Sequence, residues 1–245
     1  MTTLYLILFC AVFVGVNALN PVYVKAQRNG ACPKSLLLKM LCATGYLVTC
    51  VLAMLIGNNF TKFAWLILLA LGLSWIGDLF LHLWQHKVFH GIGFLGFLSA
   101  HFIFIWAYLT EIKALSPDRA FFSVPEVAAV VLFCVGFILF SIRIGTNLKS
   151  VLVVPVLIYA AVITTMLCKA SVMGVLYAKA GLPHGVFAAV VAIAGAALFV
   201  ASDFSIAILM FNEKHKKNYP LKMFNMVTYF LAVLLLSALP MLVAA

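Results

Sequence analysis

The sequence predicts an all-α membrane protein, built as a bundle of eight transmembrane helices. Of its 245 residues, 66% are hydrophobic and only 9% are charged, whereas about 25% of the residues of a soluble domain are charged. Eight apolar runs each approach the roughly 20 residues that a helix needs to cross a bilayer. None of them alternates with the period of two that is typical of a membrane β-barrel. We therefore expect residues 1–245 to form a single polytopic transmembrane domain.

The predicted helices follow one another through short connections. Several connections contain residues that break helices, such as Asn20-Pro21, Gly57-Asn58 and Ser116-Pro117. The first run lacks the basic start of a cleaved signal peptide, so we expect it to remain as a helix. The predicted spans are residues 2–20, 36–57, 63–83, 91–110, 124–142, 150–168, 184–211 and 221–243.

Lysine and arginine residues are more numerous on one side of the predicted membrane. Of the 16 in the chain, 11 fall at the first, third, fifth and seventh connections. Cytosolic connections usually carry this excess, so we expect both termini to lie outside the cytosol. Insertion topology and lipid headgroups then account for the net charge of +10, and we predict no nucleic-acid partner.

Two aspartates lie inside apolar runs, in similar segments. Asp78 occurs in GLSWIGDLFL of the third predicted helix, and Asp203 occurs in ALFVASDFSI of the seventh. The similarity favours two parallel four-helix repeats, residues 1–115 and 120–245, related by an axis along the membrane normal. Chance similarity between apolar helices is the alternative. In the repeat arrangement both carboxyls lie toward the cytosolic ends of their helices and can face one cavity.

These two aspartates are the first candidate catalytic residues. An ionised side chain at membrane depth costs roughly 3 kcal/mol on insertion scales, so such residues usually have a function. Burial disfavours an ionised carboxyl, and a second carboxyl nearby disfavours it further. A pair such as Asp78 and Asp203 can therefore hold one proton and offer an acid beside a base. The alternative is a structural clamp, in which each Asp bonds to Ser, Tyr or Lys of a neighbouring helix.

Histidines offer a further catalytic group. His101 lies within the fourth predicted helix, and we include it as a candidate catalytic residue, the alternative being an ordinary core histidine. His82, His86 and His90 are four residues apart, and zinc ligands on one helix face can have this spacing. Their place at a helix end is more typical of the membrane interface, so we predict no metal site.

A lysine and three hydroxyl-bearing residues are candidates for substrate binding. A lysine inside an apolar run can reach a phosphate or carboxylate, although such a residue more often extends to the headgroups. Intramembrane hydroxyls commonly bond a neighbouring helix. The candidate substrate-binding residues are Lys39, Tyr159, Thr228 and Tyr229.

Five short motifs, taken in order, resemble the YhhN family of integral membrane proteins. The motifs are Ile76-Gly77-Asp78, Gly93-x3-Phe97-x3-His101, Pro155-x3-Tyr159 with Met166, Ser202-Asp203 with Ile206-Ala207 and Phe211, and Met226-x-Thr228-Tyr229. The resemblance is strongest over residues 72–101 and 195–230. The chain has Phe104, Leu209 and Phe230 where the family often has Tyr, Asn and Tyr.

Because animal members of this family are lysoplasmalogenases, the resemblance implies hydrolysis of the vinyl-ether bond of a lysoplasmalogen. The products would be a fatty aldehyde and a glycerophospho-alcohol, the substrate a lysophospholipid taken from the bilayer, and no cofactor would be required. The alternatives are a proton-linked lipid transporter, with the aspartates as a relay, and a lipid-binding membrane protein with a degenerate site. Neither a GxSxG elbow nor a P-loop occurs, which disfavours serine esterase and nucleotide chemistry.

Overall fold

The computed structural model describes residues 1–28, 30–83, 87–143, 153–212, 214–215 and 217–243. In that part of the chain, eight helices are long and apolar enough to cross a membrane, which confirms the predicted class. The helices are α1 (Thr2–Ala26), α2 (Pro33–Gly57), α3 (Lys62–His82), α4 (Lys87–Leu115), α5 (Val124–Arg143), α6 (Val153–Lys179), α7 (Gly185–Phe211), α8 (Tyr219–Ser237) and the short α9 (Leu239–Leu242).

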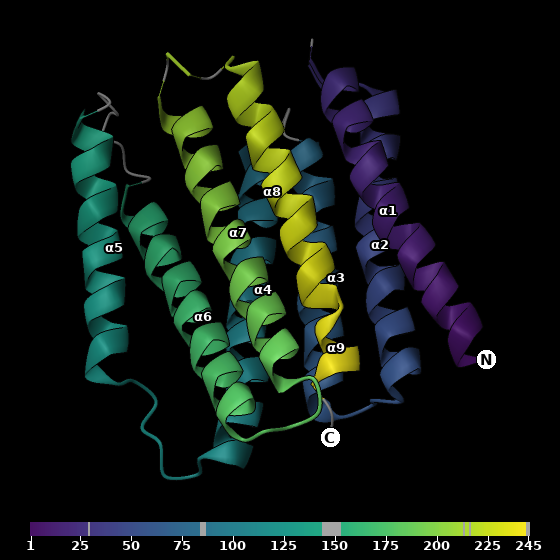
Figure 1. Cartoon of the computed structure of the whole chain (residues 1–245). Coiled ribbons are helices and arrows are strands. Elements are labelled where there is room, and N and C mark those ends of the chain that lie inside the picture. Colours follow the sequence, from purple (N-terminus) through teal and green to yellow (C-terminus); the bar gives the residue numbers. More distant parts are fainter. Residues whose placement is uncertain (29, 84–86, 144–152, 213, 216, 244–245) are drawn as a thin grey trace.

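The long helices pack in two layers (Figure 1). One layer runs α5, α6, α7, α8 and α1, and the other, behind it, runs α4, α3 and α2. Both termini lie at the same end of the bundle, as an even number of crossings requires. The side that faces the cytosol and the division into halves 1–115 and 120–245 stay predictions.

Helices α1 and α6 continue well beyond the predicted ends of their spans, each for a physical reason. The predicted break at Asn20-Pro21 is wrong, because α1 continues through Pro21 to Ala26. Neighbouring helices make a proline tolerable inside a membrane helix, and here the Asn20 side chain donates to the Met226 carbonyl of α8 at 2.9 Å. The predicted end of the sixth span at residue 168 is also wrong. Lys169, the residue directly after that predicted end, is 1% exposed inside α6.

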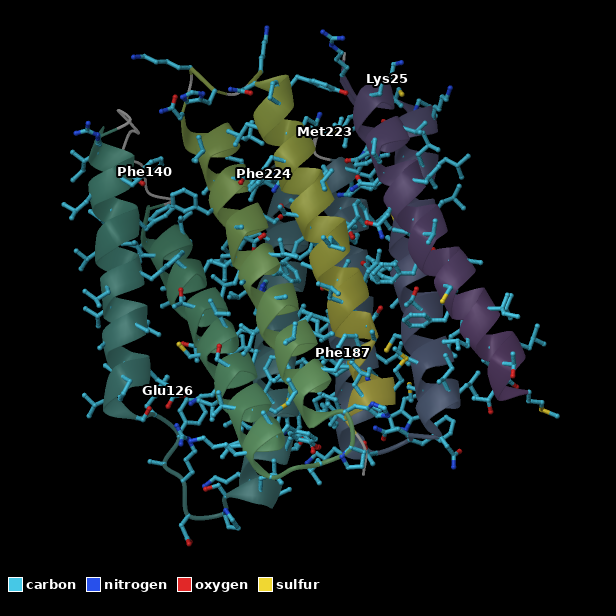
Figure 2. The ribbon with its side chains drawn as sticks, viewed as in Figure 1. Lys25, Glu126, Phe140, Phe187, Met223 and Phe224 are labelled. Carbon is cyan, nitrogen blue, oxygen red and sulfur yellow. The ribbon has the colours of Figure 1, made fainter. Side chains whose placement is uncertain are left out.

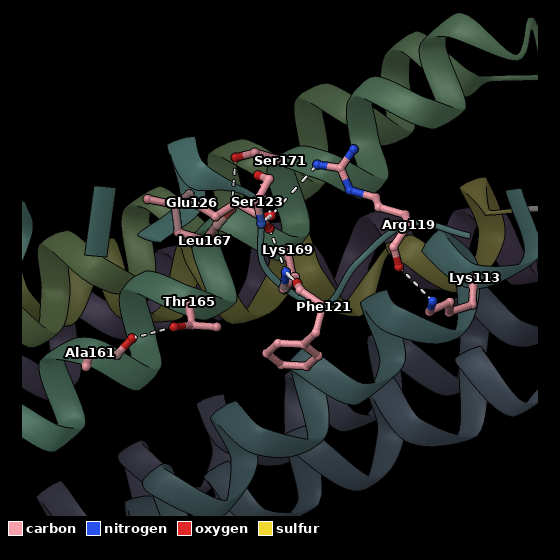
Figure 3. Close-up of polar contacts among 10 residues, drawn as sticks. All are labelled: Lys113, Arg119, Phe121, Ser123, Glu126, Ala161, Thr165, Leu167, Lys169 and Ser171. Carbon is pink, nitrogen blue, oxygen red and sulfur yellow. Dashed lines mark hydrogen bonds and ion pairs between the residues drawn. The ribbon is translucent and has the colours of Figure 1, made fainter. Parts of the chain in front are cut away.

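Lys169 is buried because it meets Glu126 near the start of α5, where the two atoms Nζ and Oε1 are 2.6 Å apart (Figure 3). The lysine also donates to the Phe121 carbonyl, and Ser123 donates to the other oxygen of Glu126 at 2.7 Å. A buried charge needs this kind of pairing and hydrogen bonding to be tolerated. The network ties the outlying helix α5 to the bundle.

The other end of α5 is held by aromatic rings. Phe137 and Phe140 contact the Phe204 ring of α7, with ring centroids 5.8 and 5.0 Å apart. Figure 2 shows Glu126 and Phe140 at opposite ends of α5. The outlying helix is therefore fixed by charge at one end and by ring packing at the other.

Glycines allow neighbouring helices to approach closely. A Cβ atom at Gly174 of α6 would lie 2.8 Å from the Cα atom of Ala189 in α7. A Cβ atom at Gly96 of α4 would lie 3.2 Å from the backbone nitrogen of Gly77 in α3. Small residues at such contacts are typical of packed membrane helices. Backbone approach therefore sets the α3–α4 and α6–α7 distances.

We expect Gly174→Ala to lower stability by roughly 1–3 kcal/mol, because the new methyl group would push α6 away from α7. The measurement is the unfolding midpoint of the purified protein in detergent. Gly136→Ala in α5 is the matched control, since no heavy atom lies within 4 Å of the Cβ position there. It should leave the midpoint unchanged or raise it slightly. Equal midpoints for Gly174→Ala and the wild type would contradict the close approach of α6 and α7.

Candidate functional site

A cavity of about 410 Å³ enters the bundle at the end opposite the termini. It extends from Gly30 and Ala31, in the connection between α1 and α2, to Tyr229 inside the bundle. Its walls come from α1, α2, α3, α4, α6, α7 and α8, and many of the lining side chains are apolar or aromatic. Both aspartates of the sequence prediction line this cavity. This is therefore the candidate site.

Asp78 of α3 is held by three side-chain donors. Its Oδ1 atom lies 3.0 Å from Nζ of Lys39, and its Oδ2 atom accepts from the hydroxyls of Tyr46 at 3.0 Å and Tyr229 at 2.6 Å. The residue is 1% exposed. An ionised carboxylate without such partners would be costly at this depth. The arrangement matches the needs of an ionised Asp78.

The sequence places these donors by helical spacing. Lys39 and Tyr46 are seven residues apart on α2, so they lie on one helix face two turns apart. Tyr229 comes from α8. Gly77 leaves room for the Phe97 ring beside Asp78, because a Cβ atom there would lie 2.7 Å from that ring. The Gly-Asp pair of the motif is thus explained by close ring packing next to the acid.

Asp203 of α7 has different partners. Its Oδ2 atom accepts from the Tyr159 hydroxyl of α6 at 2.6 Å and lies 3.7 Å from Nε2 of His101 in α4. No Lys or Arg of the described residues lies within ion-pair distance of this carboxyl. Its side chain is 15% exposed, compared with 2% for Asp78. Asp203 therefore lacks the cation that Asp78 has.

His101 lies behind Asp203 and does not line the cavity. Its Nδ1 atom is 2.6 Å from the Phe97 carbonyl. A carbonyl only accepts, so Nδ1 carries the proton and Nε2 of the neutral ring is an acceptor. This Nε2 atom is buried and has no hydrogen-bond partner among the described residues. It faces Asp203, so a protonated Asp203 carboxyl could donate to it after a small movement.

The structure brings most of the predicted site residues together. Lys39, Tyr159 and Tyr229 line the cavity with the two aspartates, whereas Thr228 does not. The Thr228 hydroxyl donates to carbonyls of its own helix, those of Phe224 at 2.8 Å and Asn225 at 3.0 Å. No hydrogen bond or ion pair joins Asp78 to Asp203 in the described part of the chain. Each carboxyl has its own set of partners within one cavity.

Four further residues of the site were not predicted as site residues from the sequence. They are Tyr46, His82, Lys222 and Asn225, of which the last three line the cavity. Spacing would have found three of them, since Tyr46 follows Lys39 by seven residues, His82 follows Asp78 by four and Lys222 precedes Tyr229 by seven. Asn225 donates to the Ser202 carbonyl at 2.7 Å and so links α8 to α7 beside Asp203.

The histidines considered as zinc ligands do not form a described cluster. His82 and His90 both line the cavity, and His86 lies outside the described residues. Among the residues that the structure describes, no three His, Cys, Asp or Glu side chains are grouped so that they could hold a metal ion.

Fold and site together define a class, a polytopic helical membrane protein with an acid-lined cavity entered from one end of the bundle. The chain matches the YhhN family over residues 35–239, which include both aspartates. It therefore belongs to the YhhN family, and the resemblance read from the motifs is confirmed. Membership is compatible with a lysoplasmalogenase-like hydrolase. No curated protein and no solved structure matches the chain.

The departures from the usual family residues fall in two places. Phe104 and Phe230 are fully buried and do not line the cavity. The Phe104 ring packs on Tyr108 and Phe199. Leu209, in contrast, lines the cavity. Two departures thus change the core, and one makes the cavity wall more apolar.

We expect Lys39→Met to lower stability by about 3–5 kcal/mol, because it leaves the Asp78 carboxylate buried without its cation. The double variant Lys39→Met/Asp78→Asn should regain most of that loss, since no charge is then left unpaired. Unfolding midpoints in detergent measure both effects. Lys25→Met, at an exposed lysine near the same end of the bundle, controls for loss of positive charge. A double variant no more stable than Lys39→Met would show that the two charges are not coupled.

Proposed function

We propose that the protein hydrolyses the vinyl-ether bond of a lysoplasmalogen, releasing a fatty aldehyde and a glycerophospho-alcohol. One observation carries the proposal, namely two intramembrane carboxyls with unlike partners in one apolar cavity. Vinyl-ether hydrolysis needs a carboxylic acid to protonate carbon and a carboxylate to stabilise the resulting cation or activate water. Glycosidases divide the same work between two carboxyl groups.

The shape of the cavity supports a single-chain lipid as the substrate. Phe94, Ile206 and Met226 contribute apolar surface to its wall. Gly91 of α4 and Pro155 of α6 line the cavity and are both exposed. A lipid tail could therefore enter between α4 and α6 while the polar end stays at the end of the bundle that bears the cavity.

In the proposed reaction, Asp203 is the acid. With no cation nearby, its neutral form is favoured, and Tyr159 and His101 orient the carboxyl. Asp203 gives its proton to the vinyl carbon farther from oxygen, which creates an oxocarbenium ion. We assign the complementary role to Asp78, whose carboxylate is held by Lys39. It faces the cation and takes a proton from the attacking water, so that a hemiacetal forms.

The hemiacetal then collapses and restores both groups. Its hydroxyl proton passes to Asp203, the bond to the glycerol oxygen breaks, and that oxygen receives the proton held by Asp78. The aldehyde and the glycerophospho-alcohol leave, Asp203 is again protonated and Asp78 is again ionised. One water is consumed. Lys39 acts as a positioning residue, because it touches Asp78 and not the reacting atoms.

Asp203→Asn should lower turnover at least about 100-fold, the usual lower range for losing a general acid. Activity is measured as aldehyde release by the purified variant. Asp118→Asn, at an exposed aspartate in a connection, is the control and should keep full activity. The role of Asp78 is tested in the stable Lys39→Met/Asp78→Asn variant. The loss of turnover in this double variant should not add to the loss of turnover in Asp203→Asn, because Asp78 and Asp203 act on one step. Full turnover by folded Asp203→Asn would exclude it as the acid.

In heavy water, the aldehyde should carry one deuterium on the carbon next to the carbonyl, and turnover should slow. Labelled water oxygen should enter the aldehyde, subject to exchange, and not the glycerol product. Mass spectrometry of both products reads these labels. An aldehyde free of deuterium at that carbon would overturn protonation by Asp203. Proton-linked lipid uptake into liposomes without any aldehyde would instead identify a transporter.

A further inference from the structure

Lys222 gives one part of the cavity an excess of positive charge. It lies in the first turns of α8, is half-buried and lines the cavity. Its ammonium donates to the Gln27 carbonyl at 3.3 Å. The other lysine of the wall, Lys39, pairs with Asp78. Lys222 has no Asp or Glu within ion-pair distance in the described chain. Lys222 is therefore a cation in the cavity wall with which an anionic ligand can pair.

His82, at the end of α3, is a second polar residue of the cavity wall. It lines the same cavity and is 4% exposed. Its Nε2 atom lies 3.1 Å from Oγ of Ser35. The Ser35 hydroxyl donates to the Cys32 carbonyl at 2.8 Å, and with that donor in use we assign the Ser35 oxygen as the acceptor for the histidine. Nε2 therefore carries the proton, and Nδ1 of the neutral ring is an acceptor.

That Nδ1 atom has no hydrogen-bond partner among the described residues. A buried polar atom without a partner is costly, and it calls for an explanation such as a role in catalysis or a bound group. Because neutral Nδ1 can only accept, the missing partner must be a donor. A phosphodiester has no proton to give. A free hydroxyl does, and a single-chain glycerophospholipid carries one on the carbon next to the ether-bearing carbon.

We propose that Lys222 and His82 form a headgroup subsite for a single-chain phospholipid, in which Lys222 pairs with the phosphate and His82 accepts from the free glycerol hydroxyl. The inference rests on the proposed function and adds the basis of substrate selection. A two-chain phospholipid has an ester in place of the hydroxyl, so it would leave Nδ1 unpaired. The subsite therefore selects lipids with one chain.

The position of His82 agrees with this assignment. It follows Asp78 by four residues on α3, which is about 6 Å along the helix axis. The hydroxyl and the ether oxygen of the substrate are on adjacent carbons. A hydroxyl held at His82 thus leaves the vinyl-ether bond within reach of the Asp78 end of the cavity. The phosphate, on the other neighbouring carbon, lies toward Lys222.

The test measures binding, so it does not depend on turnover. The probes are a saturated 1-O-alkyl lysophosphocholine, which has no vinyl bond, its 2-O-methyl ether, and the matching 1-O-alkylglycerol without phosphate. Kd values are measured by competition against a fluorescent lysolipid on the full-length protein in detergent. Wild-type protein should bind the first probe about tenfold more tightly than either analogue, the usual effect of losing one such contact.

Two variants separate the contacts. Lys222→Met should abolish the tighter binding of the lysophosphocholine over the alkylglycerol. It should keep the tighter binding of the lysophosphocholine over its 2-O-methyl ether. His82→Gln should do the reverse, because the Gln amide can replace Nε2 toward Ser35 but offers nothing at Nδ1. Lys217→Met, at an exposed lysine in the same connection region, should change neither ratio. If His82→Gln fails to fold, the wild-type ratio for the 2-O-methyl ether still decides the hydroxyl contact.

Several results would overturn the inference. Equal wild-type affinity for the lysolipid and its 2-O-methyl ether removes the hydroxyl contact. An equal loss of affinity for all three probes in Lys222→Met assigns that lysine to folding. Displacement by millimolar inorganic phosphate identifies a site for free phosphate. Failure of hydrolysis alone changes none of these ratios, so the two proposals fail separately.

Discussion

The buried ion pair between Lys39 and Asp78 is the interaction on which the arrangement of the site depends. At this depth no bulk water can solvate a charge, so each ion needs partners from the protein. The pair and its two tyrosine donors join α2, α3 and α8 around one carboxylate. Helix α8 is far from α2 and α3 in the sequence, but all three must keep the distance that the four polar groups set. The cavity lies beside this fixed cluster, and Lys39, Asp78 and Tyr229 all line it.

The fold was predictable from the sequence as far as hydropathy determines it. Eight long apolar runs in a chain with few charges permit little other than a helical membrane bundle. The ends of helices were less predictable, because Pro21 and Lys169 mark an end only when nothing compensates them. In the folded protein α1 continues through Pro21, with Asn20 bonded to α8, and Glu126 neutralises Lys169. Those partners are 206 and 43 residues away in the chain, so local patterns carry no trace of them.

The acids of the site were predictable for the same reason, because a carboxyl inside an apolar run stands out from a single sequence. Their partners were harder to identify. Thr228 and Tyr229 are neighbours with similar polar character, but successive residues of a helix point about 100° apart, and only Tyr229 reaches the cavity. His82 looked like part of an interfacial belt and proves to line the cavity. Whether a polar side chain faces the cavity or bonds to its own helix depends on how that helix is rotated about its axis. Only the packed bundle determines this rotation.

The charges of the cavity give the two proposals a common basis. With Asp78 ionised, Asp203 protonated and the two lining histidines His82 and His90 neutral, the described ionisable groups of the cavity leave one positive charge, that of Lys222. The phosphodiester of a lysophospholipid carries one negative charge and would bring the loaded cavity to neutrality, with the headgroup amine directed outward. Transfer of the Asp203 proton to carbon then creates a carboxylate and an oxocarbenium ion together. The net charge of the cavity stays constant through the difficult step, which matters because isolated charges are so costly in low dielectric. The unequal partners of the two acids are what make this possible, since a second lysine beside Asp203 would hold it ionised and leave no proton to transfer.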